Sequence, residues 1–296
     1  MIIKFNQGPL KEISGIPRFV ESKNYTTSFG IEWEYFKDIR SKANNGSFIK
    51  DTIHKRTDGW DKTFLSNKNV LEAGCGPGDD TSFFLDNGAK VYSFDYSNSV
   101  NLLKDRFENQ SHNLKIFQAD ITNIPFDNDT FDIVYCHRVL MHVKKNKKAL
   151  EELSRVLKPG GHILVHSYGK NWKTLTHWRY KYNWFTKRIP TKIILNIGLK
   201  IGPTLSKLVR FMDKKWIGKA IHHNFIPWWN LEHRKSLGFT EDQILKMEQL
   251  NFVDSLTPTY DYPLSLKKIQ KVFMKNNIKI IKITSKSPLV VLGIKE

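Results

Sequence analysis

Between residues 69 and 166 the chain alternates short apolar runs with segments of helical periodicity. Each apolar run has the length of a buried strand, and the segments between them place apolar residues on one side of a helix. The predicted strands are 69–73, 90–95, 114–118, 131–136 and 162–166, and the predicted helices are 80–87, 97–108 and 147–157. Strands and helices that alternate in this way predict right-handed crossovers and a parallel, doubly wound sheet.

Weaker patterns lie on both sides of this region. Phe29, Trp33, Phe36 and Ile39 recur at intervals of three or four residues, which predicts an amphipathic helix. After residue 254 one more helix and two strands are predicted, at 264–275, 279–283 and 289–293. The chain is therefore expected to have four parts: a leader with an amphipathic helix (1–60), an α/β core (61–166), a helical insertion after the fifth strand (167–253) and a C-terminal segment of one helix and two strands (254–296).

The first apolar run leads into a turn with glycine at every second position: Gly74, Gly76 and Gly78. Glycine adopts positive φ easily and lets a ligand approach the main chain, and a strand-to-helix turn directs free N–H groups into the crevice. Asp95 ends the next run twenty-one positions after Gly74, the spacing of an acid that binds a ribose diol. Glu72 suits a cationic amino group better than a phosphate. The pattern predicts a nucleoside site.

Five motifs in this order and spacing resemble the class I S-adenosylmethionine-dependent methyltransferases, in particular the type-11 group. They are VLEAGCGPG at 70–78, VYSFDYS at 91–97, QADITNIPF at 118–126, FDIVYCHRVLMH at 131–142 and LKPGGHILV at 157–165. The resemblance implies a Rossmann-like, seven-stranded α/β sheet with its last strand antiparallel, and S-adenosylmethionine as the cofactor. It also implies that the helix of the leader is a cap helix and that the segment 254–296 completes the sheet. The arrangement is similar to that of relatives in sugar and surface-polysaccharide biosynthesis.

The resemblance also implies roles for individual residues. The cofactor contacts that it implies are Glu72, Gly74, Cys75, Gly76, Gly78, Asp95, Tyr96, Asp120, Ile121, His137 and Arg138. In the family, the counterpart of Asp120 and the N–H at 121 meet the adenine, and the residues at 137 and 138 contact the methionine portion. The ring of Tyr96 is expected to pack on the adenine, and the alternative is a half-exposed loop tyrosine.

Three further assignments have competing interpretations. Arg56 could pair with the carboxylate of the cofactor, or it is a surface arginine. His142 faces the transferred methyl group in many relatives and could act as general base for a hydroxyl acceptor, or it caps or packs beside the cleft. Tyr260 and Asp261 belong to a DxxxPxYD phrase that borders the acceptor pocket in the relatives, so both are candidates for acceptor contact.

The charge of the chain bears on its partners. The formal net charge is +18 over 296 residues, which favours an anionic partner such as a nucleic acid, a phosphorylated substrate or a membrane surface; a solvated basic face is the alternative. Between 167 and 253 Lys and Arg outnumber Asp and Glu by roughly three to one and alternate with Trp and Tyr. That mixture suits a membrane interface or a stacked base, or a lid that packs its aromatic residues on a small core of its own.

Cysteine content and the termini indicate the compartment. Cys75 and Cys136 are the two cysteines of the chain, and both lie inside the motifs, so neither a disulfide framework nor a metal is expected. The N-terminus has no apolar signal-peptide region, and the most apolar stretch outside the core, 193–201, is too short to span a bilayer. A cytoplasmic protein is therefore predicted, with peripheral contact to the inner face of the membrane as an option.

These observations predict a methyltransferase that uses S-adenosylmethionine and acts on a small or glycan-linked acceptor, with a sugar hydroxyl as the first expectation. One alternative is an RNA or other nucleic-acid methyltransferase, which the charge favours; against it, the chain has no NPPY-type motif and no catalytic cysteine in a suitable loop. The other alternative is a protein that binds S-adenosylmethionine without transferring its methyl group. The sequence leaves open the methylated atom and the oligomeric state.

Overall fold

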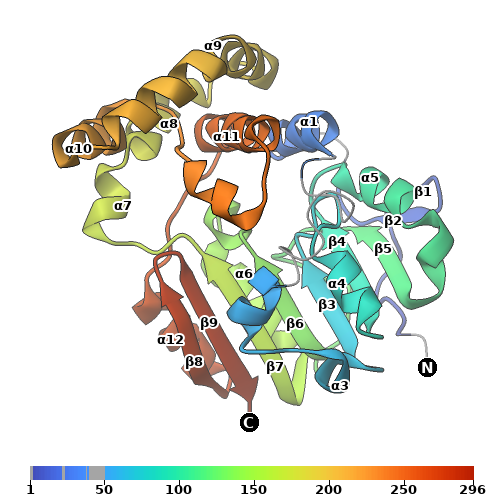
Figure 1. Ribbon diagram of the computed structural model, residues 1–296. Helices are drawn as coiled ribbons and strands as arrows, with labels where there is room; N and C mark the ends of the chain where they lie inside the picture. The colour runs from blue at the N-terminus through green and yellow to red at the C-terminus, as the bar shows by residue number, and fades with distance from the viewer. Residues whose placement is uncertain (1–2, 22–23, 38, 40–50) are drawn as a thin grey trace. The chain divides into compact units, whose positions relative to one another are not determined.

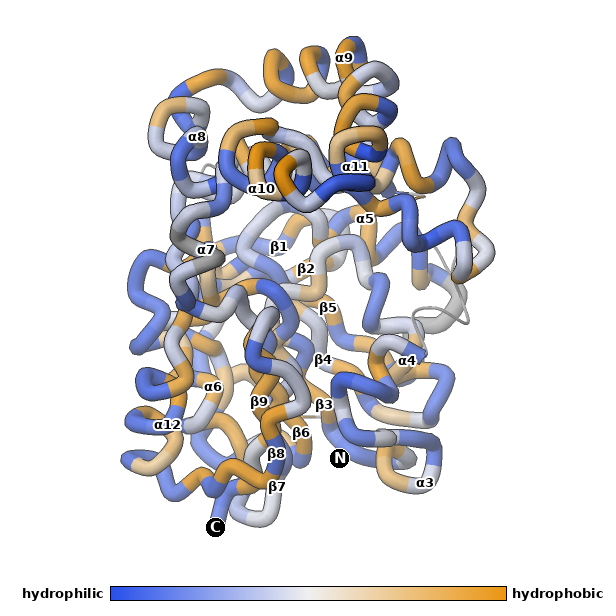
Figure 2. The backbone as a smooth tube through the Cα atoms, turned by 60° about the vertical axis from the view of Figure 1, so that its left-hand side comes forward, coloured by the Kyte–Doolittle hydropathy of each residue, from blue (hydrophilic) through white to orange (hydrophobic). Residues whose placement is uncertain are grey.

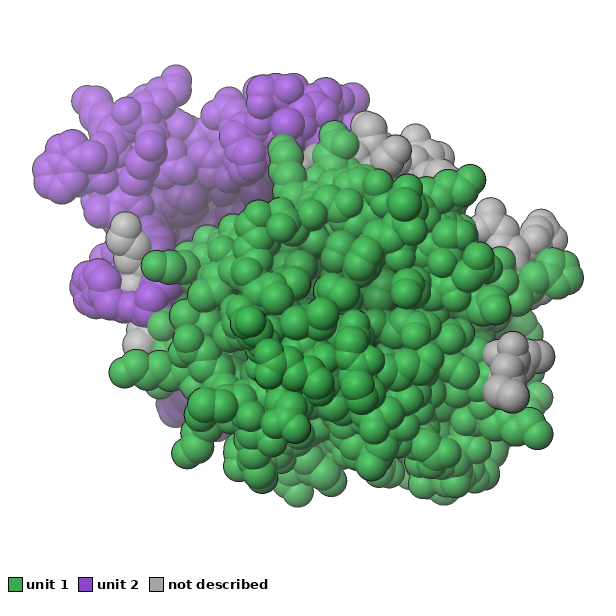
Figure 3. All heavy atoms as spheres, turned by 90° about the horizontal axis from the view of Figure 1, so that it is seen from below, with its two compact units in different colours: residues 1–24, 40–170, 262–296 green, residues 25–39, 171–261 purple. Residues whose placement is uncertain are grey.

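The computed structural model describes residues 3–21, 24–37, 39 and 51–296. Two units can be distinguished, which Figure 3 shows in different colours. Unit 1 comprises residues 1–24, 40–170 and 262–296, and unit 2 comprises residues 25–39 and 171–261. The predicted leader, 1–60, is thus divided between the two units, and unit 2 continues past the predicted end of the insertion to residue 261.

Unit 1 is built on one sheet with the strand order β1-β2-β5-β4-β3-β6-β7-β9-β8 (Figure 1). The strands are β1 (Lys11–Ile13), β2 (Ile16–Arg18), β3 (Asn69–Ala73), β4 (Lys90–Asp95), β5 (Leu114–Gln118), β6 (Phe131–His137), β7 (Leu157–Ser167), β8 (Ile278–Lys286) and β9 (Leu289–Lys295). Neighbours from β2 to β7 are parallel, whereas β9 is antiparallel to both β7 and β8. The predicted parallel core and the antiparallel last strand are confirmed.

The predicted number of strands is wrong, because the described part of the chain forms a sheet of nine strands and not seven. The two extra strands, β1 and β2, form a hairpin in the leader, where the sequence is polar and shows little periodicity. Strands of three residues are too short to show alternation. β2 is fixed by contacts distant in sequence: Arg18 pairs with Gln118 of β5, donating from Nη1 to Oε1 at 2.9 Å, and Ile16 is buried.

Helices cover both faces of the sheet. They are α3 (Lys62–Leu65), α4 (Thr81–Asp86), α5 (Ser99–Arg106), α6 (Asn146–Arg155) and α12 (Leu266–Lys275), with two 3₁₀ helices, η1 (Glu108–Asn113) and η2 (Leu140–His142). Val70 and Ile133 pack with Phe84 of α4, whereas their neighbours Leu71 and Val134 pack with Leu150 of α6 on the opposite face. Because alternate side chains of a strand point to opposite faces, the central strands are apolar on both sides, as in a doubly wound sheet.

Unit 2 is helical. Its helices are α1 (Thr27–Phe36), α7 (Trp172–Thr176), α8 (Trp178–Thr186), α9 (Thr191–Met212), α10 (Trp216–Phe225), η3 (Glu232–Leu237) and α11 (Glu241–Leu256). α11 contacts α1, α8 and α9. Its first turn is closed by a capping box in which Thr240 and Gln243 satisfy each other's backbone N–H groups. Gly198 lets α9 approach α11, since a Cβ there would lie 2.8 Å from the Phe252 ring.

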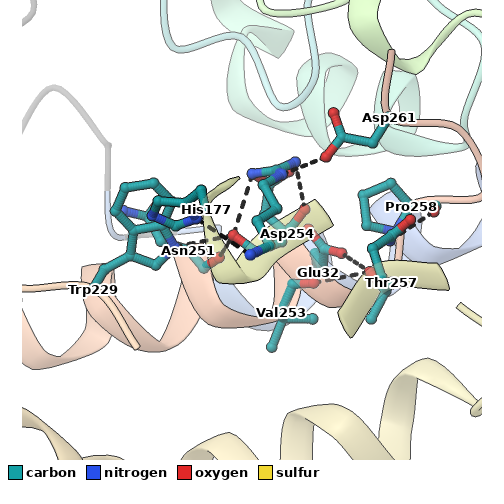
Figure 4. Close-up of polar contacts among 12 residues, drawn as sticks. Glu32, His177, Trp229, Asn251, Val253, Asp254, Thr257, Pro258 and Asp261 are labelled. Atoms are coloured by element: carbon teal, nitrogen blue, oxygen red, sulfur yellow. Dashed lines mark hydrogen bonds and ion pairs between the residues drawn. The ribbon is translucent and has the colours of Figure 1, made fainter. Parts of the chain in front are cut away.

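A buried ion cluster joins the helices of unit 2 (Figure 4). The Arg179 side chain of α8 is only 4% exposed, and its guanidinium donates to Asp254 Oδ2 (3.3 Å), the Asp254 carbonyl (2.9 Å), Ser255 Oγ (3.2 Å) and Asp261 Oδ2. α1 joins the cluster through Glu32, whose Oε1 accepts a hydrogen bond from Thr257 Oγ1 at 2.7 Å. Burial, together with the nearby Asp254, raises the pKa of Glu32 well above its usual range. The cluster therefore connects α1, α8 and α11.

Candidate active site

The glycine turn follows β3 in unit 1. Gly74, Gly76 and Gly78 have φ values of +79°, +53° and +87°, which glycine adopts at little cost. A Cβ at Gly74 would lie 2.1 Å from Cγ2 of Val139, so no larger residue fits there. The N–H of Gly74 donates to the Phe94 carbonyl at 2.8 Å, which holds the turn against the end of β4.

Asp95, at the end of β4, closes the turn from the other side. Its Oδ2 accepts the Gly76 N–H at 3.0 Å and its Oδ1 accepts the Ser97 N–H at 2.7 Å. Burial raises the pKa of Asp95, and these hydrogen bonds oppose that effect. Each carboxylate oxygen offers about two acceptor positions, so the two hydroxyls of a diol could still be bound. The structure brings the predicted turn and acid together.

Glu72 is buried beside the turn, 2% exposed. Its Oε2 accepts hydrogen bonds from Thr81 Oγ1 at 2.6 Å and Ser93 Oγ at 2.7 Å. Burial raises the pKa of Glu72 to about 8, so the carboxyl group carries a proton at neutral pH. Cys75 is a free, buried thiol whose pKa burial raises well above its usual value, and it is therefore not a reactive thiolate.

Asp80, at the start of α4, collects three donors that the sequence analysis did not connect. Its Oδ2 accepts hydrogen bonds from Tyr135 Oη at 2.6 Å, His137 Nδ1 at 2.7 Å and Arg56 Nη1 at 3.2 Å. Burial opposes ionisation of Asp80, but the hydrogen bonds and Arg56 hold its pKa well below the usual range. Burial and Arg56 lower the pKa of His137 to about 3, so its ring is neutral and Nδ1–H donates. Arg56, predicted to meet a carboxylate of the cofactor or to lie on the surface, is a buried ion-pair partner of Asp80.

His166, near the end of β7, lies directly beside His137. The two residues are paired in the register of β6 and β7, and their rings stack at a centroid distance of 4.6 Å. Three buried ring nitrogens have no hydrogen-bond partner among the described residues. They are Nδ1 and Nε2 of His166 and Nε2 of His137. Burial lowers the pKa of His166 well below its usual value. A signal was present in the sequence, because both histidines end parallel strands, where ligands bind.

The residues predicted to meet adenine lie after β4 and β5. Asp120 Oδ1 accepts the Thr122 N–H at 2.7 Å, which shapes the loop after β5. Ile121 is 5% exposed. Tyr96 is partly exposed, and its carbonyl accepts a hydrogen bond from Gln118 Nε2 at 2.9 Å. Both loops therefore leave the same edge of the sheet as the glycine turn, as predicted for the carboxyl ends of parallel strands.

Arg138 and His142 follow β6. Arg138 is exposed and has a φ of +58°, a conformation uncommon for residues other than glycine, and its N–H donates to the His166 carbonyl at 3.0 Å. His142 ends η2 and is 8% exposed, and its ring lies edge-on to Tyr168 at 6.2 Å between centroids. A general base must come within hydrogen-bond reach of the acceptor, so the catalytic role of His142 stays a prediction.

The two predicted acceptor contacts belong to unit 2. The Tyr260 ring lies edge-on to Tyr25, with 5.0 Å between centroids. The Asp261 side chain is 2% exposed; its Oδ2 pairs with Arg179, and its Oδ1 has no partner in the described part of the chain. Ion pairing with Arg179 is therefore the role that the structure gives Asp261, and its contact with an acceptor stays a prediction.

Two general features of the described residues complete the picture. None of their helices has the length and apolar character needed to cross a membrane. Within the same residues, no group of three or more His, Cys, Asp or Glu side chains could hold a metal ion. The absence of zinc from the purified protein stays a prediction.

Comparison with known proteins agrees with this geometry. Residues 71–165 match the family described as "Methyltransferase domain". Sterol 4-C-methyltransferase strm-1 of Caenorhabditis elegans is 33% identical over 127 residues, 38% of this chain and 38% of that protein. Demethylmenaquinone methyltransferase of Clavibacter sepedonicus is 33% identical over 101 residues, 34% of this chain and 41% of that protein. The matched segment spans less than half of either relative.

A solved structure extends the likeness beyond the core. Magnesium protoporphyrin IX methyltransferase (ChlM) from Synechocystis PCC 6803 aligns with 92% of this chain and 97% of its own, with a TM-score of 0.50 and 14% sequence identity. At this identity the likeness concerns the fold, which is the Rossmann-like fold of class I methyltransferases. Residues 71–165 are thus the segment of this chain that matches a methyltransferase domain, within a fold that the solved structure shares.

Proposed function

We propose that this chain is an S-adenosylmethionine-dependent methyltransferase that acts on a small-molecule acceptor. The observation that carries the proposal is the turn at 74–78 closed by Asp95, in a segment that matches a methyltransferase domain. The site fits the cofactor, because the three glycines of the turn have no Cβ to exclude it and Asp95 keeps acceptor positions for a ribose diol. The complete acidic set of Glu72, Asp95 and Asp120 opposes the alternative of binding without transfer.

In this proposal the residues of the chain bind the cofactor and orient it toward the acceptor. Asp95 holds the ribose, Asp120 and the N–H of Ile121 hold the adenine, and the Tyr96 ring packs on it. Bound S-adenosylmethionine supplies an electrophilic methyl group. Rate enhancement comes mostly from alignment of the acceptor atom for in-line attack. Where the acceptor is a hydroxyl group, His142 accepts its proton.

The remaining site residues support the binding loops. Arg56 and His137 position the start of α4 through Asp80, and Arg138 fixes the loop after β6 through its backbone N–H. Glu72, in β3, and Cys75, within the turn, are both buried. Glu72 is the residue that would meet the cationic amino group of the cofactor, whose charge would favour the ionised carboxylate.

The acceptor class is the finer part of the proposal. The relatives are named for a sterol and for demethylmenaquinone, and both names favour an apolar small molecule. The sugar hydroxyl predicted from sequence, the glycan-linked acceptor and the nucleic acid remain competing acceptors. Incubation of fractionated cell extract with methyl-labelled S-adenosylmethionine separates them. Label in the lipid fraction supports an apolar acceptor, and label confined to soluble sugar or RNA contradicts it.

The binding step can be tested separately with a double-mutant cycle. Asp95→Ala should weaken S-adenosylhomocysteine by about 1.5–3 kcal/mol, because a charge-assisted contact to the ribose is lost. Removing the 2′-hydroxyl from the ligand should weaken binding to the wild type but have little further effect in the variant. Asp127→Ala, in an exposed loop, is the control. Equal loss from the modified ligand in both proteins would mean that Asp95 shapes the turn without binding the ribose.

A further inference from the structure

α9 carries two apolar stripes, and unit 2 buries only one of them. The buried stripe comprises Ile194, Leu195, Gly198, Gly202, Ser206 and Val209. The exposed stripe comprises Ile193, Ile197, Ile201, Leu208 and Phe211, with exposed fractions from 39% to 72%. At about 100° per residue the exposed stripe covers roughly 80° of the helix surface. A helix that packs on one core needs a single apolar stripe, and the packing of this unit leaves the second stripe only partly covered.

Neighbouring helices extend this apolar surface. α10 contacts both α8 and α9 and contains no buried residue. Its exposed side chains include Trp216 (79%), Phe225 (60%), Ile217 and Ile221, and α8 adds Trp184 and Phe185. Figure 2 shows hydrophobic stretches along α9 and α10. Single exposed apolar residues are ordinary, but a group of this size on three adjoining helices marks an interaction surface.

The charges around these side chains have one sign. Between residues 178 and 225 the sequence has eleven Lys and Arg and a single acidic residue, Asp213, which is engaged by His222 and Asn230. Lys192, Lys200 and Lys207 follow α9 along one border of its exposed stripe. Within the described residues no ion pair neutralises Lys187, Lys192, Lys200, Lys207, Lys214, Lys215 or Lys219. The net positive charge is therefore available to a partner.

The combination distinguishes between possible partners. A second copy of this surface would place like charges opposite each other, which is destabilising. A nucleic acid would use the lysines and the aromatic rings, but it offers nothing to a stripe of Ile and Leu. An anionic bilayer satisfies both features, because aliphatic and aromatic side chains enter the headgroup boundary while lysines meet the phosphates.

We infer that α8, α9 and α10 form a docking surface that lies in the plane of an anionic lipid bilayer. Ile193, Ile197, Ile201, Leu208 and Phe211 face the acyl boundary, together with Trp216 of α10. The flanking lysines bind the lipid phosphates. This inference does not depend on methyl transfer, and it would bring the protein to acceptors that are dissolved in lipid.

The charge component is tested by sedimentation of the whole protein with vesicles of phosphatidylcholine and phosphatidylglycerol in equal parts. Replacing Lys192, Lys200 and Lys207 together by Gln should weaken binding about fivefold per lysine, about a hundredfold in all. The matched control replaces Lys267, Lys271 and Lys275 of α12, three exposed lysines in unit 1, and should leave binding unchanged. Equal losses in the two triple variants would reduce the effect to net charge and overturn the inference.

The apolar component needs a second pair of variants. Phe211→Ser and Trp216→Ser should each weaken vesicle binding at least about tenfold, because a large apolar side chain no longer enters the lipid. Met274→Ser, at a site of α12 that is 77% exposed, should have no effect. Absence of binding to the mixed vesicles at low salt overturns the inference. Self-association of the wild type that Trp216→Ser abolishes would also overturn the inference. The same holds if the protein binds RNA as tightly as it binds vesicles and Phe211→Ser leaves the RNA affinity unchanged.

Discussion

Each unit of this protein contains a buried arginine–aspartate cluster, and the two clusters are built differently. In unit 1 Arg56 shares Asp80 with Tyr135 and His137, so one carboxylate oxygen has three donors. In unit 2 the relation is reversed, because one guanidinium, that of Arg179, serves several acceptors on α11 and beyond.

The two clusters also differ in what they leave unsatisfied. Beside the Asp80 cluster, three buried ring nitrogens of His137 and His166 have no partner among the described residues. In the Arg179 cluster the corresponding group is a single oxygen, Asp261 Oδ1. Buried polar groups are normally paired, and an unpaired one carries a free-energy cost. The difference indicates that the Arg179 cluster stabilises helix packing, whereas the Asp80 cluster also serves the binding edge of the sheet.

Removing Arg179 should have the largest effect on stability. Arg179→Met leaves Asp261, 2% exposed, with no counter-ion, and it also removes donors from Asp254. Loss of one partner from a buried ion pair typically costs about 3–5 kcal/mol. Denaturant unfolding monitored by tryptophan fluorescence should report a loss of this size, because most tryptophans lie in unit 2. A loss below about 1 kcal/mol would show that the cluster contributes little to packing.

Removing Arg56 should cost less, about 1–3 kcal/mol, because Asp80 keeps hydrogen bonds from Tyr135 and His137. The Arg56→Met variant should also change the titration of His137. Arg56 is one of the groups that lower the pKa of this histidine to about 3, so NMR should detect a higher pKa in the variant. Losses of equal size in Arg56→Met and Arg179→Met would remove the proposed difference between the clusters.

The sheet could be predicted from sequence because its signals are local. The apolar runs at β3, β4 and β5 coincide with the predicted strands, and β6 extends one residue further than predicted. β7 begins at Leu157, five residues before the predicted start, so the segment 157–161, predicted as the end of a helix and a turn, is strand. The hairpin of β1 and β2 was missed since its stability comes from Arg18, which reaches Gln118 one hundred positions away. The Arg179 cluster was missed for the same reason. Nothing near Asp254 or Asp261 in the sequence indicates their shared arginine.

As with the sheet, the parts of the candidate site that depend on spacing along the chain were predictable, and the parts that depend on distant contacts were not. The glycine turn and Asp95 have a fixed spacing along the chain, and the structure joins them through the Gly76 N–H. Asp80 and His166 have no such spacing, because their neighbours are set by strand register and by the start of α4. Burial is also invisible in a short motif, and burial is what makes Glu72 neutral rather than charged.

The next prediction concerns Glu72 and the dependence of the free energy of unfolding on pH. The pKa of Glu72 rises from 4.5 to about 8 on folding, so between these values the folded state holds a proton that the unfolded state has lost. Glu72 should therefore contribute a fall in the free energy of unfolding as pH rises through this window, by up to about 1.4 kcal/mol per pH unit. The neutral His137 and His166 oppose this fall below 6.5, the usual pKa of histidine, so the fall should be clearest above that pH. Glu72→Gln keeps acceptors for Thr81 and Ser93 and should remove the contribution of Glu72 to the slope. Glu12→Gln, an exposed change in β1, should leave it in place, and an unchanged slope in Glu72→Gln would mean that the carboxyl is ionised.

The smallest expected change in the free energy of unfolding is that of a variant at His166. The variant is expected to be more stable than the wild type, whereas a role in ligand binding would make it bind more weakly. The His166 ring is buried against His137, and its nitrogens have no partner in the described part of the chain. His166→Phe keeps an aromatic ring in the stack and removes two unsatisfied polar atoms, so it should stabilise unit 1 by up to about 1 kcal/mol. If these nitrogens serve a ligand at the carboxyl end of the sheet, the same variant should bind S-adenosylmethionine more weakly in calorimetry. Destabilisation as large as that of Arg56→Met would contradict the first expectation, and unchanged binding would show that the histidine pair only fills space between β6 and β7.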